Sequence, residues 1–136
     1  MHEALAWKPE FSVHIAELDL QHQRLFRIIQ ELRRSVAAGE GHAVVEAAIA
    51  RVVNYTIEHF ATEESFMEEH GFPTAAEHRL EHNVLTLEIN KLQNEHEAGN
   101  AEAAMKLLEF LQRWQVEHIL RADMQYAEFV AAKAAE

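Results

Sequence analysis

Two histidines, His78 and His82, lie four residues apart on the same stripe of a helical pattern as Leu85, Ile89 and Leu92. The successive spacings of 4, 3, 4 and 3 residues place all five side chains on one face of a helix. The apolar members mark that face as the buried one. A chain with this pattern must fold with two stacked imidazoles inside it. A shared metal ion is the best explanation, because neutral imidazole is the commonest metal ligand.

Breaks in the pattern divide the chain into four helical segments. With only 4 glycines and 2 prolines, long helices are favoured over a turn-rich β fold. Glycines follow the first three segments and are expected to end them. Asp19 and Asn100 are predicted to cap the N-termini of the first and fourth segments. The T-x-x-E sequence from Thr74 to Glu77 predicts a capping box at the start of the third. The predicted helices cover about 20–38, 43–69, 75–97 and 101–132, after an extended arm over residues 1–18.

The connections between these segments are short, and short connections force neighbouring helices to run antiparallel. We therefore predict an all-α fold, an antiparallel up-down-up-down four-helix bundle with an extended N-terminal arm. A length of 136 residues is typical of one domain with one core, so residues 1–136 are expected to form a single domain.

Every predicted helix carries a residue on its apolar stripe that can bind a metal. The set is His22 in the first helix, His59 and Glu63 in the second, His78 and His82 in the third, and His118 and Asp123 in the fourth. The alternative is a bundle without metal, since a lone core histidine is usually only hydrogen-bonded. Burying the whole set that way would leave many polar atoms unpaired, at about 1–3 kcal/mol each. The remaining histidines fall in the arm, in loops or near helix ends and are predicted to face solvent: His2, His14, His42, His70 and His96.

The number of ligands indicates which metal is bound. Five imidazoles and two carboxylates are too many for one ion. Two octahedral ions that share both carboxylates and an oxo or hydroxo bridge would keep about one coordination position open, and such a nitrogen and oxygen site suits iron better than four-coordinate zinc. The chain has no cysteine, which excludes thiolate sites and disulfides. It also has no Glu-x-x-His pair of the kind that ferritin-like di-iron sites need, and a histidine-rich site favours reversible ligand binding over oxygenation.

At this point the chain resembles a hemerythrin of the bacterial kind over nearly its whole length. Each motif alone is weak, but together they are highly specific. The motifs are Trp7…Phe11-Ser12-Val13…Leu18-Asp19-x-Gln21-His22, His59-Phe60-x-x-Glu63-Glu64-x-x-Met67, Gly71-Phe72-Pro73 with His78-x-x-x-His82, and Trp114-x-x-x-His118-Ile119-x-x-x-Asp123-x-x-Tyr126.

The resemblance implies two iron ions bridged by an oxo or hydroxo group, Glu63 and Asp123. It implies one iron held by His78, His82 and His118, and a second held by His22 and His59 with an open position. It also implies that O2 binds reversibly at that open position, for carriage, storage or delivery of oxygen. Small anions are further candidate ligands there.

The spacing of five residues from His118 to Asp123 tests this interpretation. In a regular helix the two side chains would lie about 140° apart. A π-type distortion would realign them, and such distortions favour functional sites. We therefore predict one between His118 and Asp123, which would turn Tyr126 and Val130 inward in place of Gln125.

The chain departs from the family at Gln115, where an aliphatic residue, most often leucine, is usual near the O2 pocket. Gln115 lies three residues before His118, and with Ile119 and Trp114 it is predicted to line that pocket. Its amide could bond a ligand, hold a water or occupy the open position, and a water there should speed autoxidation. The alternative is a side chain turned toward solvent. His14, where the family commonly has glycine, is a smaller departure without an assigned role.

The composition and charge of the chain reduce the number of candidate partners and candidate functions. A net charge of −11 repels phosphate backbones and argues against nucleic acid. No apolar run approaches the roughly 20 residues of a membrane span, and no signal peptide is recognisable, so a cytoplasmic protein is expected. Single-sided helices and an acidic exterior predict a monomer. Besides an O2-binding protein, there are two alternatives. One is a di-iron enzyme that acts on peroxide, nitric oxide or O2. The other is a sensor module, against which we note that the chain has no room for an output domain.

Overall fold

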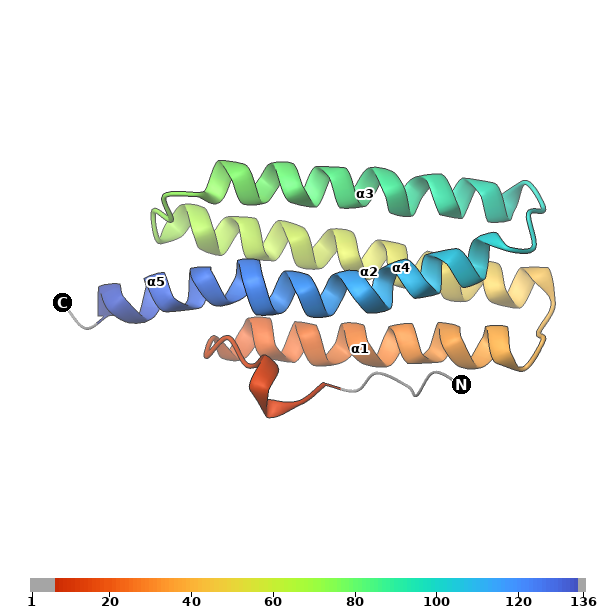
Figure 1. The fold of residues 1–136 in the computed structure, drawn as a ribbon, viewed down its shortest axis with the longest axis horizontal. Coiled ribbons are helices and arrows are strands. Elements are labelled where there is room, and N and C mark those ends of the chain that lie inside the picture. The colour runs from red at the N-terminus through yellow and green to blue at the C-terminus, as the bar shows by residue number, and fades with distance from the viewer. Residues whose placement is uncertain (1–6, 135–136) are drawn as a thin grey trace.

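In the computed structural model, residues 7–134 are described, and four helical rods form the bundle (Figure 1). The N-terminal part of the predicted arm, with His2, lies outside the described residues. A short 3₁₀ turn at Pro9–Phe11 precedes the first rod. The rods are α1 (Ala16–Ala37), α2 (His42–Glu69), α3 (Ala75–Glu97) and a fourth composed of α4 (Ala103–His118), a π-helical segment (Ile119–Asp123) and α5 (Met124–Ala134).

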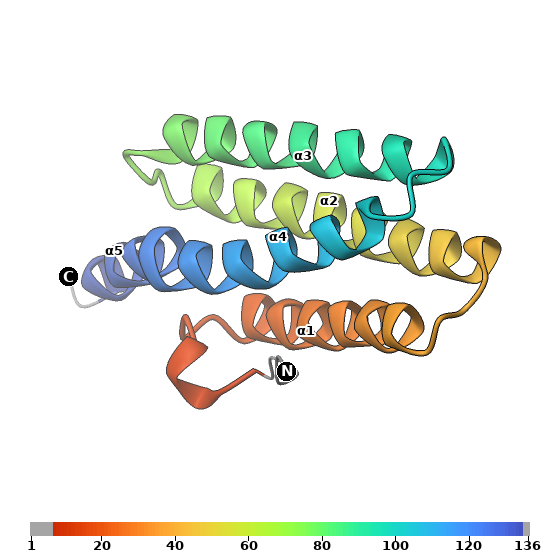
Figure 2. The same cartoon turned by 45° about the vertical axis from the view of Figure 1, so that its right-hand side comes forward.

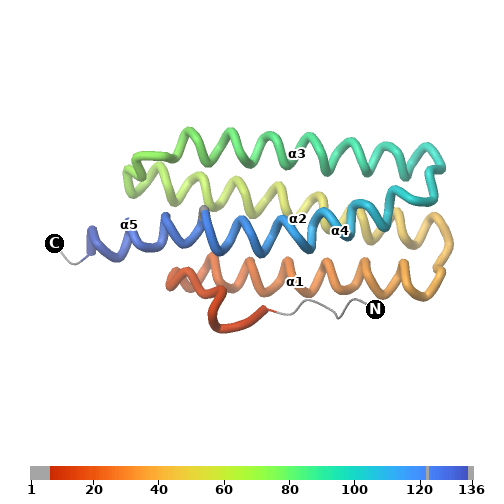
Figure 3. Tube along the Cα trace, in the orientation of Figure 1, coloured from red at the N-terminus to blue at the C-terminus, as the bar shows by residue number. Residues whose placement is uncertain are grey.

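The rods run alternately up and down, and the α1–α2 and α3–α4 connections lie at the same end of the bundle (Figures 1 and 3). Each helix packs against two others, because contacts link α1 with α2, α2 with α3, α3 with α4, and α4 back to α1. The turned view in Figure 2 shows the arm folded beside the start of α1. The predicted all-α, antiparallel four-helix bundle is confirmed. Gly39 and Gly71 end α1 and α2 with φ near +65°, a backbone conformation that glycine adopts without steric cost.

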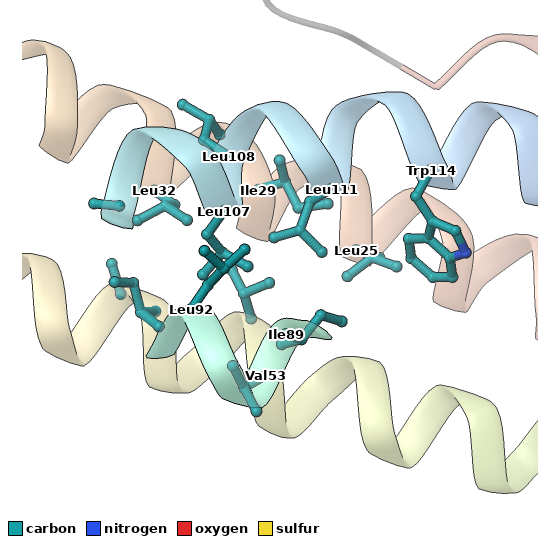
Figure 4. Close-up of a cluster of buried hydrophobic side chains, with 14 of the residues drawn as sticks. Leu25, Ile29, Leu32, Val53, Ile89, Leu92, Leu107, Leu108, Leu111 and Trp114 are labelled. Atoms are coloured by element: carbon teal, nitrogen blue, oxygen red, sulfur yellow. The ribbon is translucent and has the colours of Figure 1, made fainter. Parts of the chain in front are cut away.

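The interior has three layers along the bundle axis. A large apolar cluster fills the end beside the α1–α2 and α3–α4 connections, with side chains from all four rods (Figure 4). A second apolar cluster, which includes Phe11, Leu18, Met67 and Tyr126, fills the opposite end. The inward-facing histidines and carboxylates occupy the sequence positions between the two clusters on every rod. The apolar clusters therefore cover the polar layer from both ends.

The large cluster should carry much of the stability of the fold. Leu111 is fully buried in it, so Leu111→Ala is expected to lower the free energy of unfolding by about 2–5 kcal/mol through lost burial and a residual cavity. The measurement is urea unfolding at equal metal loading. Leu87→Ala is the matched control, because Leu87 is 71% exposed, and it should change stability by no more than about 0.5 kcal/mol. Equal losses in both variants would contradict the core assignment.

The helix starts differ from the predicted caps. The prediction that Asp19 caps the first helix is wrong, because α1 begins at Ala16. The Asp19 carboxylate instead accepts hydrogen bonds from the Ser12 hydroxyl (2.5 Å) and the Val13 amide (2.8 Å), which tie the arm to α1. Thr74 holds the N-cap position of α3 without a side-chain capping bond. Asn100 accepts from the Glu102 amide at 3.0 Å, and α4 begins after it at Ala103 rather than at residue 101.

The predicted π-type distortion is confirmed, because residues Ile119–Asp123 form a π-helical segment between α4 and α5. The extra residue per turn brings Asp123 round to the buried face of the rod. Tyr126 is buried after it and Gln125 is exposed, as the shifted register requires. Val130 is partly buried against the second apolar cluster.

Two surface features bear on partners. The outer face of α3 exposes Leu80, Val84 and Leu87, so the prediction of single-sided helices is wrong for this helix. Among the described residues, no helix combines the length and the apolar character needed to span a membrane.

His14, in the arm, has a backbone φ of +60°. Glycine adopts this conformation more readily than other residues, and glycine is the residue that hemerythrins commonly have at this position.

Candidate metal centre

The fold brings together all seven side chains that the helical stripes single out. Each is at most 5% exposed, although they come from four rods and from positions up to 101 residues apart. The residues are His22 on α1, His59 and Glu63 on α2, His78 and His82 on α3, His118 on α4, and Asp123 at the end of the π-helical segment. No local element holds more than two of them, so their convergence depends on packing between the helices.

The ligand atoms form two groups that share Glu63. One group joins Glu63 to the three histidines His78, His82 and His118, and the other joins it to His22, His59 and Asp123. Within each group the ligand atoms all lie within 4.8 Å of one another. Two neighbouring groups of this size provide space for two ions side by side.

Both carboxylates direct one oxygen toward each group. Glu63 Oε1 lies 2.6 Å from His78 Nε2, whereas its Oε2 lies 3.2 Å from His59 Nε2. Asp123 Oδ1 lies 3.0 Å from His118 Nε2, whereas its Oδ2 lies 3.2 Å from His22 Nε2. Two carboxylates with this orientation are suited to bridging a pair of metal ions.

Several of these buried atoms have no hydrogen-bond partner. Both ring nitrogens of His22, both oxygens of Asp123 and Oε2 of Glu63 make no hydrogen bond of good geometry within the described part of the chain, although ion-pair contacts such as His22 Nε2 to Asp123 Oδ2 at 3.2 Å remain. Each unpaired buried group costs about 1–3 kcal/mol, and more where it is charged. Metal ions between the imidazoles and the carboxylates would satisfy these atoms, so the donor set fits bound metal.

Neighbouring polar groups orient two of the imidazoles. His59 Nδ1–H donates to Gln21 Oε1 at 2.7 Å, and this bond turns Nε2 toward Glu63. His118 Nδ1 lies 3.3 Å from Glu81 Oε1, and Arg121 lies 3.4 Å from the same oxygen. Outer partners of this kind fix the ring and the tautomer of a metal-binding histidine. Sequence reasoning missed Glu81, because a partner on a neighbouring helix leaves no periodic signal.

Aromatic rings enclose one side of the centre. The Phe60 ring stacks on His82 at 3.9 Å between centroids, and the Trp114 ring stacks on His118 at 5.3 Å. Phe60 and Trp114 also meet edge to face at 5.3 Å. Trp114, predicted as a pocket residue, therefore lies against the three-histidine group. Burial of these rings keeps water away from the imidazoles.

Gln115 is buried, with 1% of its surface exposed, so the alternative of a solvent-facing side chain is wrong. Neither its amide nitrogen nor its amide oxygen has a hydrogen-bond partner in the described structure. Ile119 is also buried, but in the second apolar cluster rather than the large one that holds Trp114. Gln115 thus places an unpaired amide inside the bundle one turn before His118.

The two carboxylates control the charge of the imidazoles. Burial lowers the pKa of His22, but the adjacent Asp123 and Glu63 outweigh burial and raise that pKa from 6.5 to about 9. The pKa of His78 also rises to about 9, because the same carboxylates outweigh its burial. For Glu63, burial alone would raise the pKa, yet the surrounding histidines hold it well below its usual value. Without metal, His22 and His78 are therefore imidazolium groups in a network with the two carboxylates, whereas burial lowers the pKa of His59.

This network predicts a pH dependence for the metal-free protein. A histidine pKa of about 9 in the folded state and 6.5 in the unfolded state stabilises the fold below pH 6.5. That stabilisation is lost as the pH rises from 6.5 through about 9. The thermal midpoint of the metal-free protein should fall across this interval, by roughly 2–8 °C for each kcal/mol lost. The metal-loaded protein is the control, because its ligands are already deprotonated, and a midpoint that rises in the metal-free protein would contradict the network.

A four-helix bundle that buries histidines and carboxylates from all its rods belongs to the class of helical proteins with a metal centre in the bundle core. The sequence model of the hemerythrin HHE cation binding domain matches residues 13–130. The chain belongs to the hemerythrin family.

Named relatives and solved structures agree with this assignment. The chain is 34% identical over 128 residues to a bacteriohemerythrin of Stenotrophomonas maltophilia (strain R551-3), covering 94% of this chain and 82% of the relative. It is 30% identical to a myohemerythrin of Riftia pachyptila over 120 residues, 88% of each chain. A crystal structure of wild-type hemerythrin superposes with a TM-score of 0.86 at 28% identity, covering 93% of this chain and 97% of the other.

One histidine prediction outside the centre is wrong. His96 was expected to face solvent, but it is only 5% exposed. Its Nδ1 contacts the Glu46 carboxylate, and its ring stacks on His42 at 4.4 Å. His96 continues the stripe of α3 seven residues beyond Ile89, and only its place near the helix end led to the expectation that it faces solvent.

Proposed function

We propose that this protein binds O2 reversibly at a non-haem di-iron centre. The observation that carries the proposal is the pair of buried ligand groups that share Glu63 and retain unpaired oxygens and nitrogens. Five imidazoles and two carboxylates without sulfur suit iron, and membership of the hemerythrin family supports the same conclusion.

The ligands are assigned from the two groups. His78, His82 and His118 would hold one iron, while His22 and His59 would hold the other and leave it an open position. Glu63 and Asp123, together with an oxo or hydroxo group, would bridge the ions; this bridging role is supported by the orientation of one carboxylate oxygen toward each group.

Iron, when bound, would supply reversible electron transfer and the open position for O2. The chain's own residues keep that chemistry reversible. Gln21 and Glu81 hold two imidazoles in place through their Nδ1 atoms. The apolar clusters on both sides of the centre exclude water. Small anions would compete with O2 for the open position.

A second candidate is an enzyme that acts on peroxide, nitric oxide or O2 at the same centre. The observation that favours it is the same buried, unpaired amide of Gln115 one turn before His118, because a buried polar donor near the reacting centre can stabilise a reacting species. The predicted monomeric state and cytoplasmic location stay predictions.

The test is iron content with the visible spectrum, on protein reduced without air and then exposed to O2. Two irons per chain and a charge-transfer band that disappears when O2 is removed would support the O2-binding function. Two irons with immediate irreversible oxidation, and rapid peroxide turnover with a reducing dye, would favour the enzyme. Absence of bound iron would overturn both candidates.

A further inference from the structure

A second cluster of ligand side chains lies far from the central one. His42 at the start of α2, Glu46 one turn later and His96 near the end of α3 form a distal cluster whose ligand atoms lie within 4.8 Å of one another. His59 lies 17 positions after His42 on α2, a distance of about 25 Å along the helix at 1.5 Å per residue. None of the three residues belongs to the central set.

The geometry points to a second metal site at this distal cluster, specific for a divalent transition ion such as Zn²⁺. Two imidazole nitrogens and one carboxylate suit zinc, whereas calcium and magnesium prefer oxygen ligands alone. His42 Nε2 lies 3.8 Å from Glu46 Oε2, close to the roughly 3.4 Å between two ligands of a tetrahedral ion that each lie about 2.1 Å from it. The His96 Nδ1 atom contacts the same Glu46 oxygen.

Two further observations favour an ion over a simple hydrogen-bonded pair. Glu46 Oε1 is buried and has no partner among the described residues, so the carboxylate has an unused acceptor. A cavity of about 380 Å³ adjoins the cluster, and both histidines, Glu40 and Asn100 are among the residues that line it. Glu40 or a water could therefore complete the coordination.

One ligand must move for the ion to bind. The rings of His42 and His96 are stacked, with 6° between their planes, and the in-plane lone pairs of parallel rings do not converge on one point. The His42 side chain is 54% exposed and free to change rotamer, whereas His96 is held in the interior. We expect His42 to turn off the stack when the ion binds. The ion would then replace the His96 Nδ1 proton and join the first turn of α2 to the last turn of α3.

The test is Zn²⁺ titration of the full-length protein with its central cluster loaded, scored as zinc bound per chain against a competing chelating dye. The wild type should bind one additional Zn²⁺. His42→Ala and Glu46→Gln should weaken this binding by at least about 10- to 100-fold, the range for loss of even an outer partner of a metal site. Zinc should also raise the thermal midpoint of the wild type and not that of His42→Ala, because the ion binds only the folded form.

His14→Asn is the matched control, because it removes an exposed histidine in the arm and should bind zinc as the wild type does. His42 is at the surface, so His42→Ala should fold normally and its result is not confused by unfolding. No additional Zn²⁺ in the wild type, or equal binding by all the variants, would overturn the proposal. Because the variants leave the central ligands unchanged, the comparison holds whichever metal the central cluster contains.

Discussion

Replacing Glu63 by glutamine is expected to reduce the iron content from two ions per chain to one or none and to abolish the O2-dependent absorbance band. Glu63 is fully buried and belongs to both ligand groups, with His78 and His59 at 2.6 and 3.2 Å from its two oxygens. Glutamine keeps the size of the side chain but removes the negative charge and one of the two acceptor oxygens. Bridging two cations requires both of these properties. Iron analysis and the visible spectrum measure the effect.

Glu58→Gln is the matched control on the same helix. Glu58 is exposed and lies five residues before Glu63, so its replacement should leave iron content and spectrum unchanged. Circular dichroism separates loss of metal from loss of fold, because the Glu63 variant should keep its helical signal. Retention of two irons by Glu63→Gln would show that this carboxylate does not bridge the ions.

Replacing Gln115 by leucine is expected to slow autoxidation of the O2-bound protein about tenfold, the effect of about 1.4 kcal/mol on a rate. Gln115 is buried with both amide atoms unpaired, and such an amide provides a foothold for water inside an otherwise apolar core. Leucine has no amide group to which a water molecule could hydrogen-bond. The measurement is the first-order decay of the O2-dependent band in air.

The same substitution has a second readout that is independent of O2. Removing a buried, unpaired amide should raise the free energy of unfolding by about 1–3 kcal/mol. Gln125→Leu is the control, because Gln125 is exposed on α5 and its replacement should alter neither quantity. An unchanged autoxidation rate in Gln115→Leu would contradict a functional role, and unchanged stability would show that the amide has a partner.

Helix periodicity determined most of the architecture and the composition of the central set. A period of 3.6 residues links each inward histidine to the leucines and isoleucines around it, so residues such as His82 and Ile89 reveal the buried face without reference to any other helix. The spacing of His118 and Asp123 likewise required the π-helical segment, because no regular helix aligns side chains five residues apart. These are local properties of the backbone, and the sequence encodes them directly.

The helix starts could not be predicted as reliably. Asp19 has the chemistry of an N-cap, yet its carboxylate bonds to Ser12 and Val13 inside the folded arm. The helix is free to begin at Ala16 because the arm returns over it and supplies these donors. A capping motif in the sequence shows that a hydrogen-bond acceptor is present. Which backbone or side-chain donor bonds to that acceptor depends on tertiary contacts.

The sequence by itself therefore determined the number and order of the helices, their buried faces and the seven inward-facing histidines and carboxylates of the central set. Only the tertiary structure decided how each carboxylate divides its oxygens between the two groups, that Glu81 supports His118, that Gln115 is buried without a partner, and that His96 meets Glu46 and His42. The physical reason is the separation along the sequence between the residues that interact. Backbone hydrogen bonding and side-chain period repeat within a few residues, whereas these contacts join helices whose relative rotation and axial register are set by packing of the whole core.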